Sequence, residues 1–494
     1  MDRIMSGTRT VKSRHEYIVA LNSVKNSKKS VRAGKKHHFI GCGGVGMSGL
    51  ATLLLKENAI VSGSDIAKTA VTDRLIASGA DIKEGHQSDN LPDDAEAVVI
   101  SAAVEADNPE LVKAKDSGIM VYKYAQMLGL LMDGYDGLAI AGTHGKSTTG
   151  GWLVHTLVQL GLDPNYIIGA DITQLDKSSA SGSGNAFIAE ACEYDRSFLN
   201  LHPKTGVILN IEADHLDYYT DENQIVEAFT DFANGIRSDG VLLAGTEDKN
   251  VAKVVASLQG KKEVITFGIG IEGRFDWAAV NVKLEKDFTS FDVHYNGEFI
   301  AAAKIQLPGI HNVRNALAVV ASAVAAGAEA KTVIEKLGEF TGMDRRMEEK
   351  GRVDGIVIVD DYAHHPTEIK ASLEAVRQKY APQRLICVFQ PHQYSRTRFL
   401  LKDFSQSFVL ADLTIVPEIY FVRDTAESKS LVDAEKLVAE IQKCGSEAIF
   451  VDSFERICEY LKSNVKSGDV VITMGAGDIW KVADEYIRWF KGNS

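Results

Sequence analysis

The sequence predicts an α/β protein made of three successive domains, each built on a mainly parallel sheet. Short apolar segments alternate with helical segments along most of the chain, a pattern typical of parallel strands covered by helices. A chain of 494 residues is also too long for a single hydrophobic core. Finally, glycine-rich or polar segments follow strands in three separate regions, and ligands bind at such strand ends in open α/β sheets.

The first domain, with a Rossmann-like parallel sheet, is expected over residues 37–135. A strand at 38–40 leads into a glycine turn at 41–46, and a second strand, 59–65, ends in an aspartate. This spacing makes a diphosphate site at a helix N-terminus, with a carboxylate placed for a ribose or a base. Both NAD and a UDP-sugar fit such a site. The residues predicted to bind this ligand are Gly43, Gly44, Val45, Gly46 and Asp65.

The central domain, expected over residues 136–341, begins with a phosphate-binding loop of the P-loop ATPase type. A strand at 138–140 runs into the segment 141–149, and a helix follows. Backbone N–H groups at such a helix start cradle phosphate oxygens, a lysine reaches the β- and γ-phosphates, and a serine hydroxyl binds Mg²⁺. Ile140 stands where a standard P-loop has its first glycine, so this loop is tighter. A nucleoside triphosphate site is predicted from Gly142, Thr143, His144, Gly145, Lys146, Ser147 and Thr148.

The same domain offers candidate metal ligands at further strand ends. The predicted strands 186–189 and 206–210 run into acidic and histidine-bearing segments. Triphosphate chemistry needs a metal ion to offset charge, and Mg²⁺ prefers oxygen ligands to imidazole. The candidates are Ser147, Glu190 and His215, although a buried, hydrogen-bonded histidine is the alternative interpretation of His215.

An alanine-rich helix that closes the central domain begins near His311. Alternating residues around 288–294 predict added antiparallel strands before it. Amide side chains can pair with the edge of adenine, which makes Asn312 and Asn315 candidates for binding a nucleotide base. Asparagine at a helix start is also a common cap, so Asn312 keeps both interpretations.

The C-terminal domain, expected over residues 342–494 with a Rossmann-like pattern, carries the remaining polar clusters. Its predicted strands are 356–359, 384–389 and 470–473. The first strand leads to the doublet His364 and His365 beside Asp361, and adjacent imidazoles next to carboxylates are an unusual arrangement for a core. Arg396 follows the second strand and could hold a carboxylate with two hydrogen bonds.

Together these clusters fit an ATP-driven ligation. In such a reaction a substrate carboxylate attacks the γ-phosphate and an amine then traps the acyl phosphate, so the protein mainly positions groups and stabilises charge. Arg346 offers a cation for the γ-phosphate, with an exposed linker charge as the alternative. The candidate catalytic residues are Lys146, His215, His364, His365 and Arg396.

Composition excludes several other classes of protein. The net charge of −13 argues against a binder of duplex nucleic acid. No apolar run approaches the roughly 18 residues that span a bilayer, so no membrane insertion is expected. Five scattered cysteines favour reduced thiols and a cytoplasmic location. Residues 1–36 are basic and are expected to form a solvated tail, with an organelle transit peptide as the alternative. The oligomeric state is left open.

From residue 37 onward the chain resembles the Mur ligase family of peptidoglycan synthesis. The motifs that carry the resemblance, in order, are FIGCGGVGMSG (39–49), GTHGKST (142–148), EACEYD (190–195), DH (214–215), HNVRNA (311–316), DDYAHHPT (360–367) and FQPHQYSRT (389–397). Several long motifs in one order are a specific signal. The last motif is most similar to the alanine-adding branch of the family.

The resemblance implies substrates, cofactors and residue roles. It implies ATP and Mg²⁺ as cofactors and, as substrates, L-alanine and UDP-N-acetylmuramate, the latter held by the first glycine turn instead of NAD. It implies Lys146 on the phosphates, and Ser147, Glu190 and His215 around Mg²⁺. The residues implied to hold adenosine and the γ-phosphate region are His311, Asn312, Asn315, Asp361 and Arg346, and those implied to serve the amino acid and the muramyl carboxylate are His364, His365 and Arg396.

One departure from the family pattern concerns a second Mg²⁺. Many relatives place a carbamylated lysine after the Asp-His motif, and no lysine occurs here between His215 and Lys249. The alanine-adding branch lacks that lysine too, so the second metal ion alone is in doubt.

Four alternatives are weaker. A recycling ligase that attaches a whole tripeptide to the same UDP-sugar shares the phosphate loop and the His-His-Pro motif. Folylpolyglutamate synthetase has no need of the first glycine turn. If the protein were a nicotinamide-dependent dehydrogenase, Lys146 would have no function. If it were a non-catalytic nucleotide-controlled module, His364 and His365 would have no function.

Overall fold

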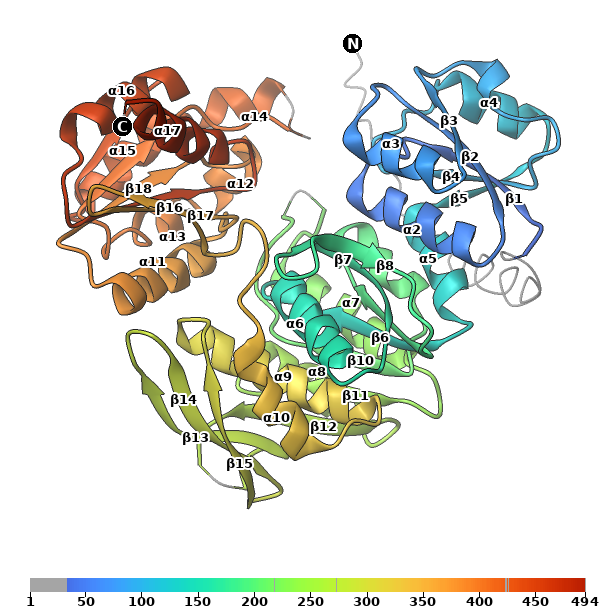
Figure 1. Ribbon diagram of the computed structural model, residues 1–494, viewed down its shortest axis with the longest axis horizontal. Coiled ribbons are helices and arrows are strands. Elements are labelled where there is room, and N and C mark those ends of the chain that lie inside the picture. The colour runs from blue at the N-terminus through green and yellow to red at the C-terminus, as the bar shows by residue number, and fades with distance from the viewer. Residues whose placement is uncertain (1–32, 217, 272, 423, 425, 494) are drawn as a thin grey trace, which may run out of the picture. The chain divides into compact units, whose positions relative to one another are not determined.

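The computed structural model describes residues 33–216, 218–271, 273–422, 424 and 426–493 (Figure 1). All but the last four residues of the predicted basic segment, 1–36, lie outside this part of the chain. The chain separates into two compact units, the first ending at Leu131 and the second beginning at Met132. The described residues form three sheets, one in the first unit and two in the second, and the α/β class is confirmed.

The sheet of the first unit is parallel throughout, in the order β3-β2-β1-β4-β5. Its strands are β1 (Lys36–Ile40), β2 (Ile60–Asp65), β3 (Asp81–Glu84), β4 (Ala97–Ile100) and β5 (Met120–Lys123), and its helices are α2 (Val45–Lys56), α3 (Ala70–Ala77), α4 (Pro109–Asp116) and α5 (Tyr124–Met132). The order reverses between β2 and β4 at the central strand β1. The glycine turn that follows β1 therefore lies at the switch point where open sheets bind ligands.

The first sheet of the second unit has ten strands, in the order β15-β14-β13-β12-β11-β10-β6-β9-β7-β8. The strands are β6 (Asp136–Ala141), β7 (Asn165–Ile172), β8 (Lys177–Ala180), β9 (Ala186–Glu190), β10 (Thr205–Ile208), β11 (Val241–Ala244), β12 (Glu263–Ile269), β13 (Trp277–Leu284), β14 (Thr289–Tyr295) and β15 (Glu298–Ile305). The helices are α6 (Lys146–Gln159), α7 (Glu222–Gly235), α8 (Lys249–Leu258), α9 (Ile310–Ala325) and α10 (Ala330–Lys336). The expected antiparallel strands are confirmed as the β13–β15 meander.

Two strands of this sheet were not predicted. Between α6 and the predicted strand 186–189 the chain forms β7, which pairs with β9 and carries the short strand β8 on its outer side. Polar residues such as Asp171 in β7 and the sequence KSSA in β8 hid these strands, because they break the apolar run of a buried strand.

The helix α6, which begins at the phosphate loop, is anchored deep in the core. Trp152 is fully buried, stacks on Phe340 with ring centroids 5.3 Å apart, and donates its indole N–H to the carbonyl of Leu337. Gly151 lets the helix approach Met343, because a Cβ there would lie 2.1 Å from the Met343 Sδ. The loop therefore ends at a helix that is fixed in the core and packs against the segment leading to the third sheet.

The third sheet has the order β16-β17-β21-β18-β19-β20, with only β16 antiparallel to its neighbour. Its strands are β16 (Glu348–Val353), β17 (Ile356–Asp361), β18 (Arg384–Phe389), β19 (Leu413–Val416), β20 (Ala448–Phe450) and β21 (Asp469–Met474). Its helices are α11 (Pro366–Tyr380), α12 (Tyr394–Phe399), α13 (Leu401–Ser405), α14 (Ala426–Leu431), α15 (Ala434–Lys443), α16 (Phe454–Asn464) and α17 (Trp480–Asn493).

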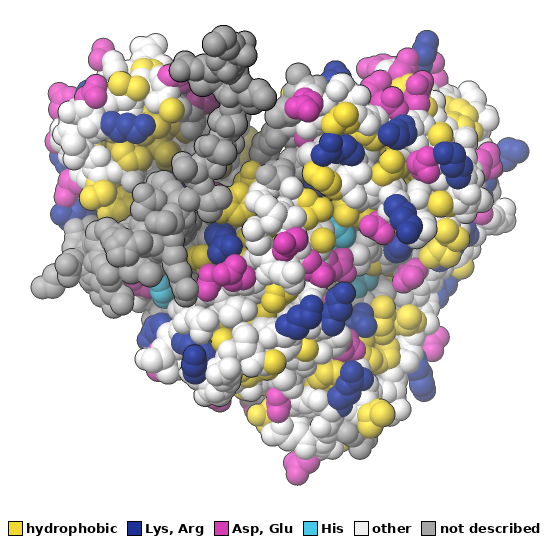
Figure 2. All heavy atoms as spheres, turned by 180° about the vertical axis from the view of Figure 1, so that it is seen from behind, with side chains coloured by type: hydrophobic (Ala, Val, Ile, Leu, Met, Phe, Trp, Pro, Cys, Tyr) yellow, Lys and Arg dark blue, Asp and Glu magenta, His cyan; other side chains and the backbone are white. Residues whose placement is uncertain are grey.

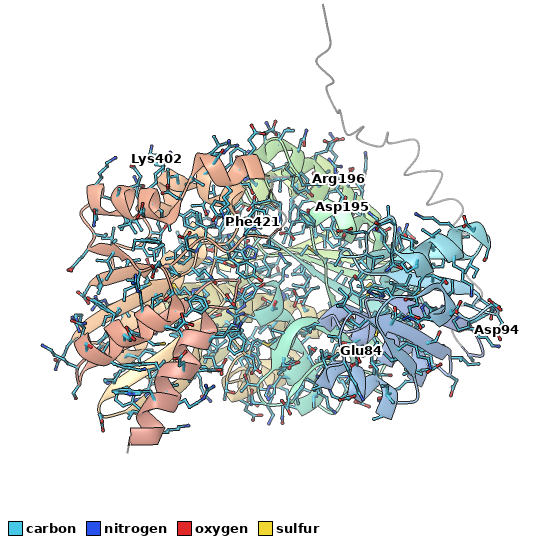
Figure 3. All side chains as sticks on the ribbon, turned by 90° about the horizontal axis from the view of Figure 1, so that it is seen from above. Glu84, Asp94, Asp195, Arg196, Lys402 and Phe421 are labelled. Carbon is cyan, nitrogen blue, oxygen red and sulfur yellow. The ribbon has the colours of Figure 1, made fainter. Side chains whose placement is uncertain are left out.

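Both faces of this third sheet are covered by helices. Successive strand residues point to opposite faces, so Val359 packs in the core under α11 and α15 whereas Ile358 packs under α16 and α17. Lys402, in contrast, is exposed on α13 (Figure 3). On the face drawn in Figure 2, Lys and Arg side chains are interspersed with Asp and Glu. No helix among the described residues is long and apolar enough to cross a membrane.

Candidate active site

The phosphate loop runs from the end of β6 to the start of α6 and depends on two glycines. Gly142 and Gly145 have φ values of +146° and +85°, which favour glycine. A Cβ on Gly142 would lie 3.0 Å from the Leu209 Cβ, and one on Gly145 would lie 2.9 Å from the Asn315 Oδ1. The first N–H groups of a helix have no partner one turn earlier, so the start of α6 is suited to an anion.

Lys146, the first residue of α6, is paired with an acid that the sequence did not single out. Its Nζ lies 2.9 Å from the Glu193 Oε2 and also donates to the carbonyls of Gly142 and Thr143. Burial lowers the pKa of Lys146, but the carboxylate of Glu193 outweighs burial and the pKa is raised. The ammonium is therefore held charged at the loop. Glu193 is fixed in turn, since the Tyr219 hydroxyl donates to its carbonyl.

The three candidate Mg²⁺ ligands lie at the same end of the sheet but make no contact with one another among the described hydrogen bonds and ion pairs. Ser147 is in the first turn of α6, and Glu190, which ends β9 opposite Ile140, accepts a hydrogen bond from the Gly169 N–H. The His215 Nε2 lies 3.8 Å from the Glu193 Oε1. With Glu193 added, the possible metal ligands near Lys146 include two carboxylates and a hydroxyl, and these oxygen ligands suit a hard divalent cation.

The adenosine candidates lie at the start of α9, beside the phosphate loop. Asn315 donates to the Asn312 Oδ1, and the Asn312 amide donates to the Pro308 carbonyl. Asn312 is therefore not a cap in this structure, because the N-cap residue is Gly309 and no side chain caps the helix. Burial, together with Arg314, lowers the pKa of His311 to about 4, so its imidazole is neutral at pH 7.

Asp361, at the end of β17, organises the loops around it. Its carboxylate accepts hydrogen bonds from the N–H groups of Met347 and Ala363 and from the Ser372 hydroxyl. Burial raises the pKa of Asp361 to about 6. In the structure Asp361 therefore fixes the neighbouring backbone. Its contact with adenosine stays a prediction.

The histidine doublet lies where β17 turns into α11. His365 is the N-cap of α11: its Nδ1 accepts from the Thr367 N–H, and its Nε2 lies 3.2 Å from the Ala213 carbonyl oxygen. The Nδ1 of His364 lies 3.0 Å from the Tyr362 carbonyl oxygen. A carbonyl can only accept, so His364 carries its proton on Nδ1 and leaves Nε2 as an acceptor. Burial lowers the pKa of His364 to about 4.

Glu368, in the first turn of α11, is a second acid that the sequence did not single out. Its carboxylate contacts the His144 Nδ1 at 3.2 Å, accepts from the His364 N–H at 3.0 Å, and lies 3.8 Å from Arg346. Burial raises the pKa of Glu368, but interactions with His364, His144 and Arg346 outweigh burial and hold the pKa well below its usual value.

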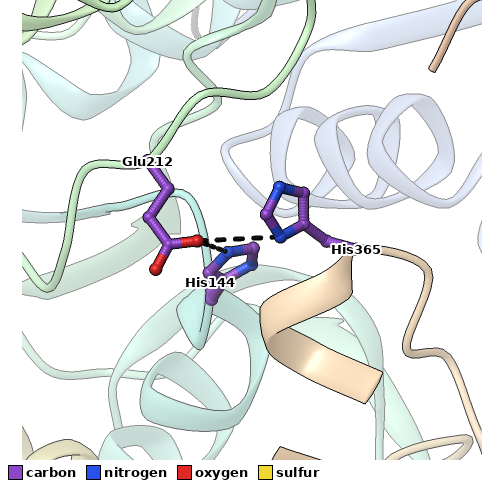
Figure 4. A group of neighbouring side chains, drawn as sticks. All are labelled: His144, Glu212 and His365. Carbon is purple, nitrogen blue, oxygen red and sulfur yellow. Dashed lines mark hydrogen bonds and ion pairs between the residues drawn. The ribbon is translucent and has the colours of Figure 1, made fainter. Parts of the chain in front are cut away.

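His144 lies between two carboxylates, one from each sheet of the second unit. Its Nε2 is 3.2 Å from the Glu212 Oε2 (Figure 4). The same carboxylate oxygen accepts from the Thr367 hydroxyl. Burial lowers the pKa of His144, but the hydrogen bonds with Glu212 and Glu368 outweigh burial and raise it to about 9. The phosphate loop is thus bound electrostatically to the start of α11.

Arg396 has its predicted carboxylate partner, but the carboxylate belongs to the protein. Its Nε and Nη2 each lie 3.0 Å from the Asp214 Oδ1, and both side chains are buried. Burial raises the pKa of Asp214, but the guanidinium of Arg396 outweighs burial and lowers it. The expected contact with a substrate carboxylate stays a prediction.

The glycine turn of the first unit is held by hydrogen bonds to residues at the end of β2. The Gly43 N–H donates to the Asp65 Oδ2 at 2.7 Å, and a Cβ on Gly43 would lie 2.9 Å from that oxygen. The N–H groups of Gly41 and Cys42 donate to the Ser64 carbonyl. Helix α2 begins directly after Gly44, at Val45, and no side chain caps it. The start of α2 fits an anionic ligand. Asp65 holds the turn, and its predicted contact with the ligand stays a prediction.

Three family models match the chain in sequence order. They are the Mur ligase family catalytic domain over residues 36–136, the Mur ligase middle domain over 140–323, and the Mur ligase glutamate ligase domain over 345–477. The chain belongs to the Mur ligase family. A UDP-N-acetylmuramate–L-alanine ligase from Clostridium tetani is 42% identical over 92% of this chain and 98% of its own length.

Solved structures of the Mur ligase family show the same architecture. The UDP-N-acetylmuramate–alanine ligase from Thermotoga maritima matches with a TM-score of 0.76 and 26% identity, covering 93% of this chain and 100% of that chain. A murein peptide ligase from Psychrobacter arcticus matches with a TM-score of 0.67 and 25% identity, covering 92% and 99%.

Sequence reasoning missed three acids of this Mur ligase, although weak signals for each were present. Glu193 follows Glu190 by three residues in one motif, and Glu212 precedes His215 by three. Glu368 stands three residues after the N-cap His365, where helices favour an acid. The sequence does not predict which residue each acid contacts, because the lysine and histidines concerned lie far away in the sequence.

Proposed function

We propose that this Mur ligase joins L-alanine to the carboxylate of UDP-N-acetylmuramate, driven by ATP. The observation that carries the proposal is the contact of the phosphate loop, through His144, with the histidine-bearing start of α11. This contact brings a triphosphate-binding segment next to the neutral imidazoles of His364 and His365, which can bind an amine. The name of the 42% identical relative from C. tetani supports the same substrates.

ATP and Mg²⁺ would be held in the central part of the chain. The N–H groups at the start of α6 and the Lys146 ammonium are suited to the phosphates, and Asn312 and Asn315 lie beside the loop for adenosine, with His311 next to them. Ser147, Glu190 and His215 remain the proposed Mg²⁺ ligands, and Glu193 joins them as an acid between Lys146 and His215. The ion would supply charge stabilisation during phosphoryl transfer.

The reaction needs two bond exchanges. A carboxylate oxygen of the muramyl group attacks the γ-phosphorus and ADP leaves, and the alanine nitrogen then attacks the acyl carbon and phosphate leaves. The amine must give up a proton, and the Nε2 of His364 is an acceptor held neutral at pH 7 by its lowered pKa. Lys146 and Arg346 stabilise the negative charge that moves between the phosphates.

The UDP-sugar is assigned to the first unit, at the turn that includes Gly43, Gly44, Val45 and Gly46, with Asp65 behind it. We also propose a division into domains at 37–135, 136–341 and 342–494, which the boundaries of the three family matches support. A cytoplasmic location is proposed from the same family assignment.

Release of ADP by the purified chain tests the proposal. ADP should form only when UDP-N-acetylmuramate, ATP, Mg²⁺ and L-alanine are present together, and glycine and L-serine should be poorer substrates. The resemblance to a solved UDP-N-acetylmuramate:L-alanyl-γ-D-glutamyl-meso-diaminopimelate ligase, at 29% identity and a TM-score of 0.57, favours a tripeptide as the second candidate. ADP release with the tripeptide L-alanyl-γ-D-glutamyl-diaminopimelate exceeding that with L-alanine would favour that function instead. Binding of NADH by the first unit would contradict both.

A further inference from the structure

A group of three side chains outside the proposed Mg²⁺ ligands has the composition of a transition-metal site. His144, Glu212 and His365 each offer a ligand atom, and these atoms lie within 4.8 Å of one another (Figure 4). The Glu212 Oε2 is 3.2 Å from the His144 Nε2 and 3.7 Å from the His365 Nδ1. Ligands of one zinc ion stand about 3.3 Å apart when each is about 2.0 Å from the metal in a tetrahedral site. Small side-chain movements, with release of the hydrogen bond from the Thr367 N–H to the His365 Nδ1, would complete the geometry.

The second nitrogen of each imidazole is already held as metal sites require. Histidine ligands almost always donate their other ring N–H to a carboxylate or a backbone carbonyl, which fixes the ring and its tautomer. Here the His144 Nδ1 faces the Glu368 carboxylate at 3.2 Å, and the His365 Nε2 faces the Ala213 carbonyl at 3.2 Å. The Thr367 hydroxyl donates to Glu212 and orients the carboxylate.

The identity of the ligand atoms points to a metal class. Two imidazole nitrogens and one carboxylate oxygen suit zinc and its neighbours in the first transition row, whereas Mg²⁺ prefers oxygen ligands alone. An ion there would replace the proton that the His144 Nε2 shares with Glu212.

We propose that His144, Glu212 and His365 form a binding site for a zinc-class divalent cation, distinct from the Mg²⁺ ligands proposed above. Its three ligands come from the phosphate loop, the segment after β10 and the start of α11. A bound ion therefore ties the first sheet of the second unit to the third sheet and restrains the phosphate loop.

Zinc binding to the metal-stripped, full-length chain tests this site. Competition with a chromophoric zinc chelator should show one ion per chain. The affinity should fall at least ~10-fold in His144→Gln, Glu212→Gln and His365→Asn, and also in Glu368→Gln, which leaves the three ligands in place but weakens the support of the His144 Nδ1. Asparagine is a good helix N-cap, so His365→Asn should retain the cap and the fold. His215→Asn, which removes a nearby imidazole outside the group, is the matched control and should bind zinc as tightly as the unaltered chain.

Two further readouts identify the ligands. X-ray absorption of the zinc-loaded chain should show nitrogen and oxygen neighbours at ~2.0–2.1 Å and no sulfur at ~2.3 Å, which excludes the exposed Cys192 and Cys444. Zinc should raise the thermal midpoint of the unaltered chain and of His215→Asn but not of His365→Asn. The proposal is overturned if the unaltered chain binds no zinc, if sulfur is a ligand, or if His215→Asn abolishes binding while the three ligand variants retain it.

Discussion

Arg396 and Asp214 form a buried ion pair in which two guanidinium nitrogens lie 3.0 Å from one carboxylate oxygen. Arg396 is on α12, beside the third sheet, and Asp214 follows β10 of the ten-stranded sheet. The pair therefore fixes the segment that carries His215, a proposed Mg²⁺ ligand, relative to α12.

Replacing Asp214 with asparagine should destabilise the protein strongly. The change leaves the buried guanidinium without a counter-charge, which typically costs about 3–5 kcal/mol. Urea unfolding of the second unit measures the effect. The matched control is Arg352→Ala, which breaks the exposed pair with Glu349 and should change stability by less than ~1 kcal/mol. Equal effects of the two changes would show that the Asp214 pair is not the buried support described here.

Lys146→Ala should abolish turnover while the protein stays folded. Removing a cation that stabilises phosphate charge during transfer should lower kcat by roughly 100-fold or more. Turnover is measured by ADP release and folding by circular dichroism. Lys402→Ala, at an exposed position on α13, is the control and should leave kcat unchanged. Normal turnover by Lys146→Ala would remove the lysine from the proposed mechanism.

Gly145→Ala should impair the phosphate loop more than a left-handed backbone alone explains. The substitution adds the strain of φ +85° to a contact of 2.9 Å with the Asn315 Oδ1. Gly161→Ala is the matched control, since φ is +73° there but no atom lies within 4 Å of the added Cβ. Both variants should lose about 1–2 kcal/mol of stability from backbone strain, but only Gly145→Ala should raise the KM for ATP. Equal KM values in the two variants would argue against a nucleotide at this loop.

Stability should fall in mild acid, in part because of His364. Its pKa in the folded protein is lowered to about 4, below the ordinary 6.5, so between these pH values the unfolded chain binds the extra proton. Unfolding free energy then decreases as pH falls, by up to about 1.4 kcal/mol per pH unit for one such group. Urea titrations from pH 7 to pH 4.5 should show a shallower decrease in His364→Asn. Parallel curves for the variant and the unaltered chain would refute the buried neutral state.

The sequence predicted the parts of the site in which residues that act together are also neighbours in the chain. The phosphate loop, the glycine turn after β1 and the histidine doublet before α11 are local patterns, and each lies at the strand end where it was expected. The partners of these residues were not predictable in the same way. Glu193 pairs with Lys146, and Glu368 with His144, only because the sheets bring distant segments together.

The contacts of Arg396 and Asp361 also could not be predicted from the sequence. Arg396 was expected to bind a carboxylate, and the geometry of a bidentate cation was a sound reason, but nothing in the sequence distinguishes a substrate carboxylate from Asp214. The family resemblance implied that Asp361 holds adenosine, and in the structure its carboxylate accepts hydrogen bonds from the backbone N–H groups of Met347 and Ala363. Strand ends identify where polar residues gather, and only the folded backbone determines what each one contacts.

The most direct test of the central claim is the substrate dependence of ADP release by the purified chain. With ATP and Mg²⁺ present, ADP should accumulate when both UDP-N-acetylmuramate and L-alanine are supplied, and mass spectrometry should find one alanyl-UDP-N-acetylmuramate per ADP. ADP release that continues unchanged without the sugar nucleotide, or without the amino acid, would contradict the account.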